Sequence, residues 1–443
     1  MSANTALTSN VSASQHICVF LWMLTSALGA LGIEGGAAVL ADEGQGFQRV
    51  SGDNIELVTD LPIDDSIREL PQLFDAAMPE WCRVFNVDPA EAKQWRATAY
   101  LMVARERFKA AGYLPESLPP FPHGYQWGDD MWVVEQASQY YRRHLLLHEG
   151  THWFMFRKYG SAGPPWLMEG LAEWLATHRW QNARLQMGLI PKSREDVPLW
   201  GRIPLIQQQI EDGLAPSMAT ILRYDGRAHQ SAEAYAWSWA MVVFLKNHPS
   251  TQAAFNKLLE GPITSDDTPT NQLLRSIQTR RPLVRTEWSA MLTGLDYGFQ
   301  PERELVRLDH RCDELTQPVT VPVSATRGWQ TTGVQVSAGQ RVVVTAKGRF
   351  VIGRLPKPWE CEPAGVTLRY HNGQPLGKLL LAIAGPQAKE PEFSEQFNVE
   401  PIGAEATVTA TTTGQILLRI NETGAGLDDN QGELSVTLMP ASN

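Results

Sequence analysis

The hydrophobic pattern divides the chain into a part with much helical periodicity and a part made of short strand-like runs. Residues 55–59 alternate apolar and polar side chains with period 2, and residues 97–103 form a second strand-like run. A proline-rich segment at 114–123 precedes a helical pattern over 133–159. A second helix is expected from the Pro164–Pro165 pair to about residue 180, since proline is tolerated in a helix's first turn. Further helices are predicted over 217–223, 232–246 and 251–259.

Beyond about residue 316 the pattern changes to short runs rich in β-branched residues, separated by glycine-containing turns. These runs lie at 319–323, 341–346, 406–410, 416–420 and 434–438. Their spacing is typical of a β-sandwich. The predicted fold class is therefore α+β, with a mixed α/β domain over 42–315 followed by an all-β sandwich domain over 316–443.

The N-terminal segment resembles an export signal. Residues 17–33 are almost wholly apolar, and small residues follow up to Ala41, which is a plausible cleavage site. The signal is atypical because no Lys or Arg precedes Arg49. An uncleaved membrane anchor and a buried helix remain as alternatives. We expect residues 1–41 to be a signal peptide and the mature protein to be secreted or periplasmic.

Composition excludes several classes of protein. The chain has 443 residues, of which 43% are hydrophobic, so wholesale disorder is excluded. Its formal net charge is −10 and it contains no Lys/Arg-rich run, which argues against a nucleic-acid partner. The 4 Cys show no CxxC spacing, so a Cys-based zinc site is not expected.

The candidate chemistry lies in two consecutive predicted helices. Residues 148–152 read HEGTH, an HExxH motif, and on a helix His148 and His152 share one face beside Glu149. Two imidazoles suit Zn²⁺, and the Glu149 carboxylate can take a proton from metal-activated water. Glu169 follows on the second helix and can supply the third ligand, while Glu173, one turn later, can hold a ligand imidazole by its free N–H. The alternative is that both are ordinary helix carboxylates.

The segments HEGTH and PPWLMEGLAE resemble the gluzincin metallopeptidases, the thermolysin-like clan, and most of all the bacterial secreted proteins with a peptidase MA-like domain. The resemblance is specific over 144–180 and looser over 54–250. It implies that His148, His152 and Glu169 bind zinc and that Glu149 is the general base. Gly150 departs from the family's pattern, in which this position is usually larger, and a glycine there could widen the cleft near the metal.

Other residues have weaker assignments. In gluzincins a Tyr or His on a later helix often stabilises the oxyanion, and Tyr235 is the candidate, although a Tyr among tryptophans is often a core residue. His144 shares the face of His148 but is expected to be packed rather than a ligand, and His178 is expected to cap its helix or face solvent. In this clan the substrate-binding edge strands lie just before the metal helix, which makes 124–128 and 131–134 the candidates, and ordinary sheet packing is the alternative.

The C-terminal domain has a second candidate site. Residues 421–432 gather oxygen-bearing side chains in a glycine-rich loop, a composition that suits Ca²⁺ but is also common in ordinary turns. Over about 327–439 the chain resembles the PA-IL-type galactophilic lectins, a galactose-binding-like family. That resemblance implies calcium binding by Glu422, Asp429, Asn430 and the carbonyl of Ile352, although the family usually has Asp at the first position and Asn at the second. The alternative is a plain structural or docking module.

Two functions follow as hypotheses. The first is a secreted zinc metallopeptidase that hydrolyses peptide bonds of a protein or peptide substrate. The second is a protein that binds carbohydrate or a cell-surface glycan and whose peptidase-like domain is a catalytically weak scaffold. A C-terminal domain that targets an active peptidase would combine them.

Overall fold

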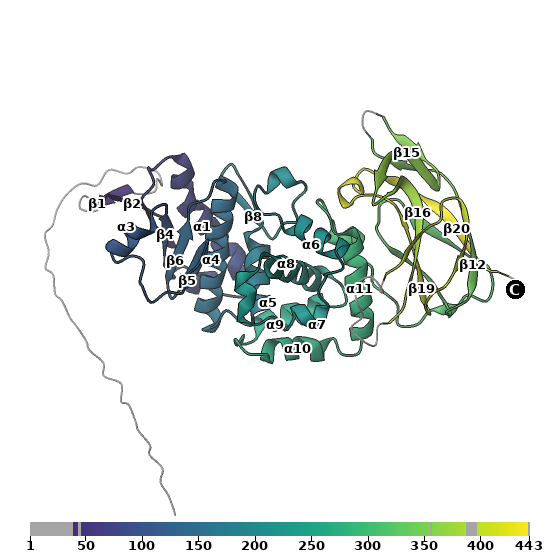
Figure 1. Ribbon diagram of the computed structural model, residues 1–443, viewed down its shortest axis with the longest axis horizontal. Coiled ribbons are helices and arrows are strands. Elements are labelled where there is room, and N and C mark those ends of the chain that lie inside the picture. Colours follow the sequence, from purple (N-terminus) through teal and green to yellow (C-terminus); the bar gives the residue numbers. More distant parts are fainter. Residues whose placement is uncertain (1–38, 43–45, 355–356, 387–396, 442–443) are drawn as a thin grey trace, which may run out of the picture. The chain divides into compact units, whose positions relative to one another are not determined.

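The computed structural model describes residues 39–42, 46–354, 357–386 and 397–441 (Figure 1). These residues form both helices and sheets, so the chain is of the α+β class. None of the helices in these ranges is long and apolar enough to span a bilayer. Residues 1–38 of the predicted signal peptide lie outside the described residues. Cleavage after Ala41 would also remove most of the first strand, β1 (Val39–Asp42).

The N-terminal part is built on a mixed six-stranded sheet. In spatial order its strands are β1 (Val39–Asp42), β2 (Phe47–Ser51), β3 (Ile55–Thr59), β4 (Ala97–Met102), β6 (Asp130–Val134) and β5 (Gly124–Trp127). Strands β3, β4 and β6 are parallel, and β5 pairs antiparallel with β6. Strand β5 is therefore an edge of the sheet, whereas β6 is interior.

Helices α1 (Asp65–Phe85) and α4 (Gln139–Tyr159) pack against this sheet and against each other. Helix α4 begins where the Ser138 side chain accepts a hydrogen bond from the backbone N–H of Tyr141, and it ends at Gly160, whose φ of 71° is left-handed. The predicted helix over 133–159 therefore started too early. The apolar residues up to Val134 belong to β6 because they pair with β4.

The second helix, α5 (Pro165–Ala176), starts at the predicted proline pair but ends earlier than predicted. Its expected last residues form β7 (His178–Gln181), which pairs with β8 (Arg184–Met187). The other helices are α2 (Pro89–Ala92), α3 (Arg105–Ala110), α6 (Arg202–Glu211), α7 (Met218–Ile221), α8 (Ala232–Asn247), α9 (Gln252–Glu260), α10 (Thr268–Ser276), α11 (Arg281–Gly294) and α12 (Pro301–Glu304). Helices α7, α8 and α9 fall at the three segments predicted as helical.

The C-terminal part consists of two six-stranded sheets. One contains β10 (Val319–Ser324), β12 (Arg341–Lys347), β13 (Phe350–Ile352), β14 (Trp359–Cys361), β18 (Glu405–Thr409) and β20 (Gln431–Pro440). The other contains β9 (Asp313–Glu314), β11 (Gln330–Val336), β15 (Ala364–His371), β16 (Gln374–Ala384), β17 (Val399–Pro401) and β19 (Gly414–Ile420). Buried side chains of both sheets, such as Val344 and Leu418, belong to one apolar cluster.

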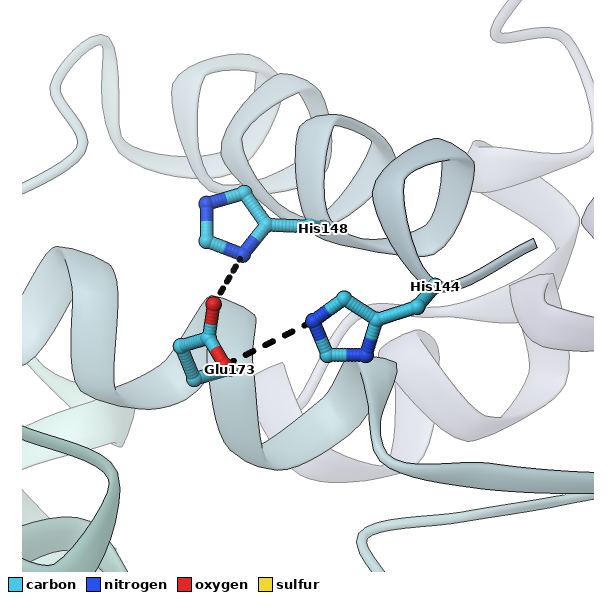
Figure 2. Close-up of side chains that lie close together, drawn as sticks. All are labelled: His144, His148 and Glu173. Atoms are coloured by element: carbon cyan, nitrogen blue, oxygen red, sulfur yellow. Dashed lines mark ion pairs between the residues drawn. The ribbon is translucent and has the colours of Figure 1, made fainter. Parts of the chain in front are cut away.

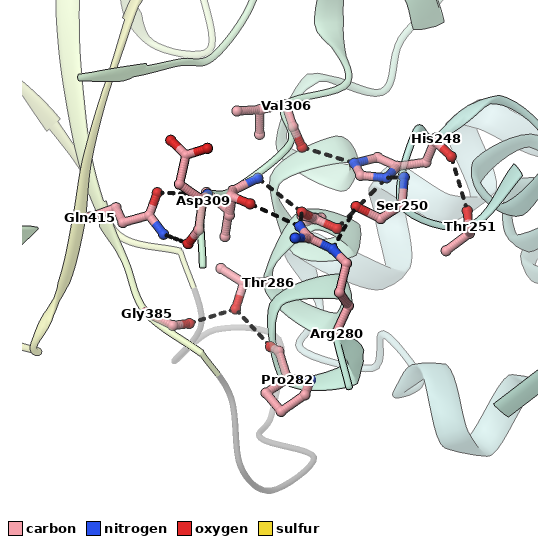
Figure 3. Close-up of polar contacts among 12 residues, drawn as sticks. His248, Ser250, Thr251, Arg280, Pro282, Thr286, Val306, Asp309, Gly385 and Gln415 are labelled. Atoms are coloured by element: carbon pink, nitrogen blue, oxygen red, sulfur yellow. Dashed lines mark hydrogen bonds and ion pairs between the residues drawn. The ribbon is translucent and has the colours of Figure 1, made fainter. Parts of the chain in front are cut away.

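The C-terminal sheets contact the helical part through buried groups (Figure 3). The Thr286 hydroxyl on α11 donates a hydrogen bond of 2.6 Å to the carbonyl of Gly385. The Gln415 side chain on β19 accepts from the Asp309 backbone N–H at 3.1 Å and donates to the Asp309 carbonyl. A domain boundary near 315 stays a prediction, since the two parts share these contacts.

Candidate metal centre

Three side chains from two helices converge at one point. His148 and His152 lie one turn apart on α4, and Glu169 faces them from α5. Their ligand atoms form a triangle: 3.0 Å between the two Nε2 atoms, 3.2 Å from His148 Nε2 to Glu169 Oε2, and 3.4 Å from His152 Nε2 to the same oxygen. All three residues are buried.

This triangle fits a tetrahedral zinc ion. With metal–ligand bonds of about 2.0–2.1 Å and tetrahedral angles, neighbouring ligand atoms lie about 3.3 Å apart. A cation at this point is also favoured electrostatically. Burial alone would lower the pKa of His148, but Glu169 and Glu173 raise it to about 10. The carboxylates that stabilise a proton on this imidazole would equally stabilise a metal cation in its place.

Glu149 lies beside the triangle, in the interior of the protein. Its side chain is only 6% exposed, and burial raises the pKa of its carboxyl group. The nearby His148 and His152 oppose this shift, whereas Glu169 adds to it. The arrangement therefore places a second carboxylate next to the candidate metal ligands.

Glu173 connects the candidate ligand His148 to a residue that sequence reasoning missed. Its Oε1 lies 3.3 Å from His148 Nδ1 (Figure 2). Arg202, at the start of α6, donates two hydrogen bonds of 2.9 Å, one to each oxygen of Glu173. Burial alone would raise the pKa of Glu173, but Arg202 and His144 outweigh it and hold this pKa well below its usual range. Glu173 is therefore an anion that holds the His148 ring.

His144 completes a second group of ligand types with His148 and Glu173 (Figure 2). Its Nε2 lies 3.5 Å from Glu173 Oε2, while its Nδ1 is 3.0 Å from the Ala176 carbonyl, to which an N–H there donates. A cation among these three side chains would lie next to the Arg202 guanidinium, which already engages both oxygens of Glu173. Charge repulsion therefore argues against a metal at this second point.

Tyr235, on α8, lies at the same centre. Its ring is 5.9 Å from the His148 ring, and the Arg202 guanidinium lies 5.7 Å from its centroid. Burial, then the neighbouring Glu169 and Glu149, raise the pKa of its hydroxyl, so the group is protonated at neutral pH. The close approach of α8 depends on Gly170 of α5, where a Cβ would lie 2.5 Å from the Ser238 carbonyl oxygen.

One expectation about a neighbouring residue was wrong. Gly150 does not widen a cleft near the metal, because it faces α1: a Cβ there would lie 2.7 Å from Trp81 and 2.8 Å from Phe74. Of the two roles expected for His178, the structure shows capping and not exposure to solvent. The residue is 4% exposed, and its Nδ1 lies 2.8 Å from the carbonyl of Ala176, the last residue of α5. Of the two segments proposed as edge strands, only β5 is at an edge.

The structure places the candidate calcium residues around one end of the C-terminal sheets. Ile352 lies on β13, which pairs with β20 directly after Asn430. Asp429 Oδ2 accepts the Arg354 backbone N–H at 3.2 Å, and the Glu422 carboxylate accepts that of Thr423. Asn430 donates 2.9 Å to the Ala325 carbonyl, while its buried Oδ1 has no hydrogen-bond partner among the described residues.

Comparison with known proteins does not assign the chain to a family. No protein-family model matches the chain, and no curated protein matches it. Several solved structures match in part, among them the following three. The N-terminal domain of EclA, a PllA-like lectin, is 19% identical and covers 28% of this chain and 98% of its own, with a TM-score of 0.22. PliG of Aeromonas hydrophila, a periplasmic inhibitor of g-type lysozyme, is 10% identical over 31% of this chain and 93% of its own, with a TM-score of 0.16.

The third is IMPa of Pseudomonas aeruginosa, solved in complex with an O-glycopeptide. It is 10% identical and covers 92% of this chain with a TM-score of 0.17, and this chain spans about half (51%) of its length. All three TM-scores are below 0.5, so these similarities establish neither the fold nor the function of this chain.

Proposed function

We propose that this protein is an exported zinc metallopeptidase with a gluzincin-like domain over about 42–315 and a β-sandwich domain over about 316–443. The observation that carries the proposal is the triangle of His148, His152 and Glu169, whose edges of 3.0–3.4 Å fit three ligands of a tetrahedral zinc ion. Three protein ligands would leave the fourth position of a tetrahedral zinc ion for water and substrate, as in catalytic zinc sites.

The chain's own residues can perform the proton transfers of peptide hydrolysis. A zinc ion held by His148, His152 and Glu169 would supply a Lewis acid and a water of lowered pKa. Glu149 can accept the proton of the attacking water and deliver it to the leaving amine. The Tyr235 hydroxyl can donate a hydrogen bond to the carbonyl oxygen as negative charge develops on it. Glu173, held by Arg202, keeps the His148 ring in the required orientation.

A peptide substrate can bind along β5. This strand is the edge of its sheet, and α4 packs beside it. An extended peptide can add to such an edge through backbone hydrogen bonds. The peptide would then pass the carboxylate of Glu149, because the first residue of β5, Gly124, is in close contact with that side chain.

The test combines metal analysis with peptide hydrolysis on the full chain. Mass spectrometry should find one zinc per chain, and Glu169→Ala should reduce this content. Glu149→Gln should keep the zinc and lower the hydrolysis of a mixed fluorogenic peptide library by about 10²-fold or more. Glu260→Gln, at an exposed position at the end of α9, is the matched control and should hydrolyse normally. A chain that takes up no zinc after reconstitution would overturn the proposal.

A second function is calcium-dependent carbohydrate binding by the C-terminal sheets, as the lectin resemblance implies. Its calcium part is supported by the buried Oδ1 of Asn430, which has no hydrogen-bond partner among the described residues. An amide oxygen of this kind is a suitable calcium ligand. Retention of the protein on galactoside-bearing resin should require calcium and be lost in Asn430→Ala. Equal retention with calcium and with a chelator would contradict this second proposal.

A further inference from the structure

Gly124 lies where any side chain would collide with Glu149 in its present orientation. A Cβ there would lie 2.3 Å from Oε1 of Glu149, 2.9 Å from its Cδ and 3.0 Å from its Cγ. The backbone of Gly124 does not have a positive φ, so the glycine is required for space and not for its conformational freedom. The first residue of the edge strand β5 thus leaves a slot that the Glu149 carboxyl group fills.

The Glu149 side chain has little free space around it. It is only 6% exposed, and α4 packs directly against β5. His148, His152 and Glu169 are close enough to act on the pKa of its carboxyl group. A side chain at position 124 would therefore push the carboxylate out of its present orientation, in surroundings that are already filled.

We propose that Gly124 is a positioning residue for Glu149: its missing side chain forms the slot that fixes the carboxylate beside the two imidazoles. This inference rests on the proposed peptidase function, in which Glu149 carries the proton. It adds a residue 25 positions away in sequence that contributes only space.

The catalytic test compares Gly124→Ala with Gly226→Ala. Gly226 is a matched control because a Cβ there meets nothing within 4 Å and its φ is not positive. Gly124→Ala should bind zinc with a dissociation constant within about 3-fold of the unsubstituted protein's. Its kcat should fall by about 10²-fold with KM little changed, because a displacement of about 1 Å costs that much in rate. A kcat equal to that of Gly226→Ala would overturn the proposal.

A second measurement needs no catalysis. The melting temperature of metal-free protein should fall by several degrees in Gly124→Ala, since overpacking destabilises a buried site. In the Glu149→Ala background, where the slot is empty, the same substitution should cause almost no fall. Equal falls in both backgrounds would overturn the inference.

The two measurements also separate this inference from the proposed function. If the unsubstituted protein hydrolyses no peptide, the peptidase proposal fails and the positioning role fails with it. This holds even where the fall in melting temperature caused by Gly124→Ala depends on Glu149. If the protein hydrolyses peptides and Gly124→Ala lowers the melting temperature equally with and without Glu149, only the role of Gly124 fails.

Discussion

Replacement of Arg202 by Met should strongly destabilise the metal-free protein. Arg202 is 9% exposed and makes two hydrogen bonds of 2.9 Å to Glu173, which is 2% exposed. Methionine keeps much of the aliphatic volume but removes the charge. Glu173 would then keep only the more distant nitrogens of His148 at 3.3 Å and His144 at 3.5 Å. A buried carboxylate would be left without its main counter-charge.

The expected cost has a lower and an upper bound. Removing one partner of a buried ion pair typically costs about 3–5 kcal/mol in the free energy of unfolding. The loss of unfolding free energy is also limited, because Glu173 can bind a proton and become neutral when its counter-charge is removed. At pH 7, protonating a carboxyl with an ordinary pKa of about 4.3 costs about 3.7 kcal/mol. We therefore expect a loss of about 3 to 4 kcal/mol, a large part of the about 5–15 kcal/mol that stabilises a typical domain.

Urea unfolding at pH 7 with a chelator present, followed by both tryptophan fluorescence and circular dichroism, measures this loss. Coincident transitions check that unfolding is two-state. Arg227→Met is the matched control, because Arg227 pairs with Asp225 at the surface with 86% of its side chain exposed. Exposed pairs contribute about 0–1 kcal/mol. The double variant Arg202→Met/Glu173→Gln should regain most of the loss. A cost of Arg202→Met no larger than the control's would refute the reasoning.

Three further predictions concern other parts of the structure. Burial raises the pKa of Glu304 to about 7, whereas the pKa of a Glu in the unfolded chain is about 4.3. The folded state therefore holds this proton more tightly than the unfolded state does. The stability that this proton contributes is present at low pH and is lost as the pH rises through 7. Between pH 5 and pH 8 the free energy of unfolding, measured in urea, should therefore fall by up to about 3 kcal/mol more than in Glu304→Gln. Calcium should raise the melting temperature, and Asn430→Ala should abolish this rise in a thermal-shift assay. Gly170→Ala should cost about 1–3 kcal/mol by overpacking α5 against α8, whereas Gly226→Ala should cost less than about 1 kcal/mol, both measured by urea unfolding.

The candidate site was predictable where its geometry is local. His148 and His152 are four residues apart, so helical periodicity alone brings them onto one face. Glu169 was found because the helix that carries it follows directly and begins at a recognisable proline pair. The relation of Tyr235 to these residues is a contact across the fold, and the sequence supported it only through the family resemblance.

The predicted boundaries of helices and strands were wrong where a local sequence pattern fits both kinds of element. The apolar run up to Val134 could extend the helix of residue 139 or form its own strand, and pairing with β4 decided for the strand. Helix α1 was not predicted at all. It contains Pro71 and Pro79 within its length, residues that locally oppose a helix, yet its apolar face is buried in the core.

Three glycines show what remains invisible in a single sequence. Gly124, Gly150 and Gly170 have ordinary backbone φ values, so no turn or cap signals their purpose. Each lies where the side chains or backbone of another element leave no room for a Cβ: Gly124 against Glu149, Gly150 against Trp81, and Gly170 against the backbone of α8. Together they set how closely β5 and α1 approach α4, and how closely α8 approaches α5. The candidate metal ligands are therefore recognisable from a few residues close together in sequence. The distances between the helices and strands that carry them depend on glycines, which have no side chain to signal that role.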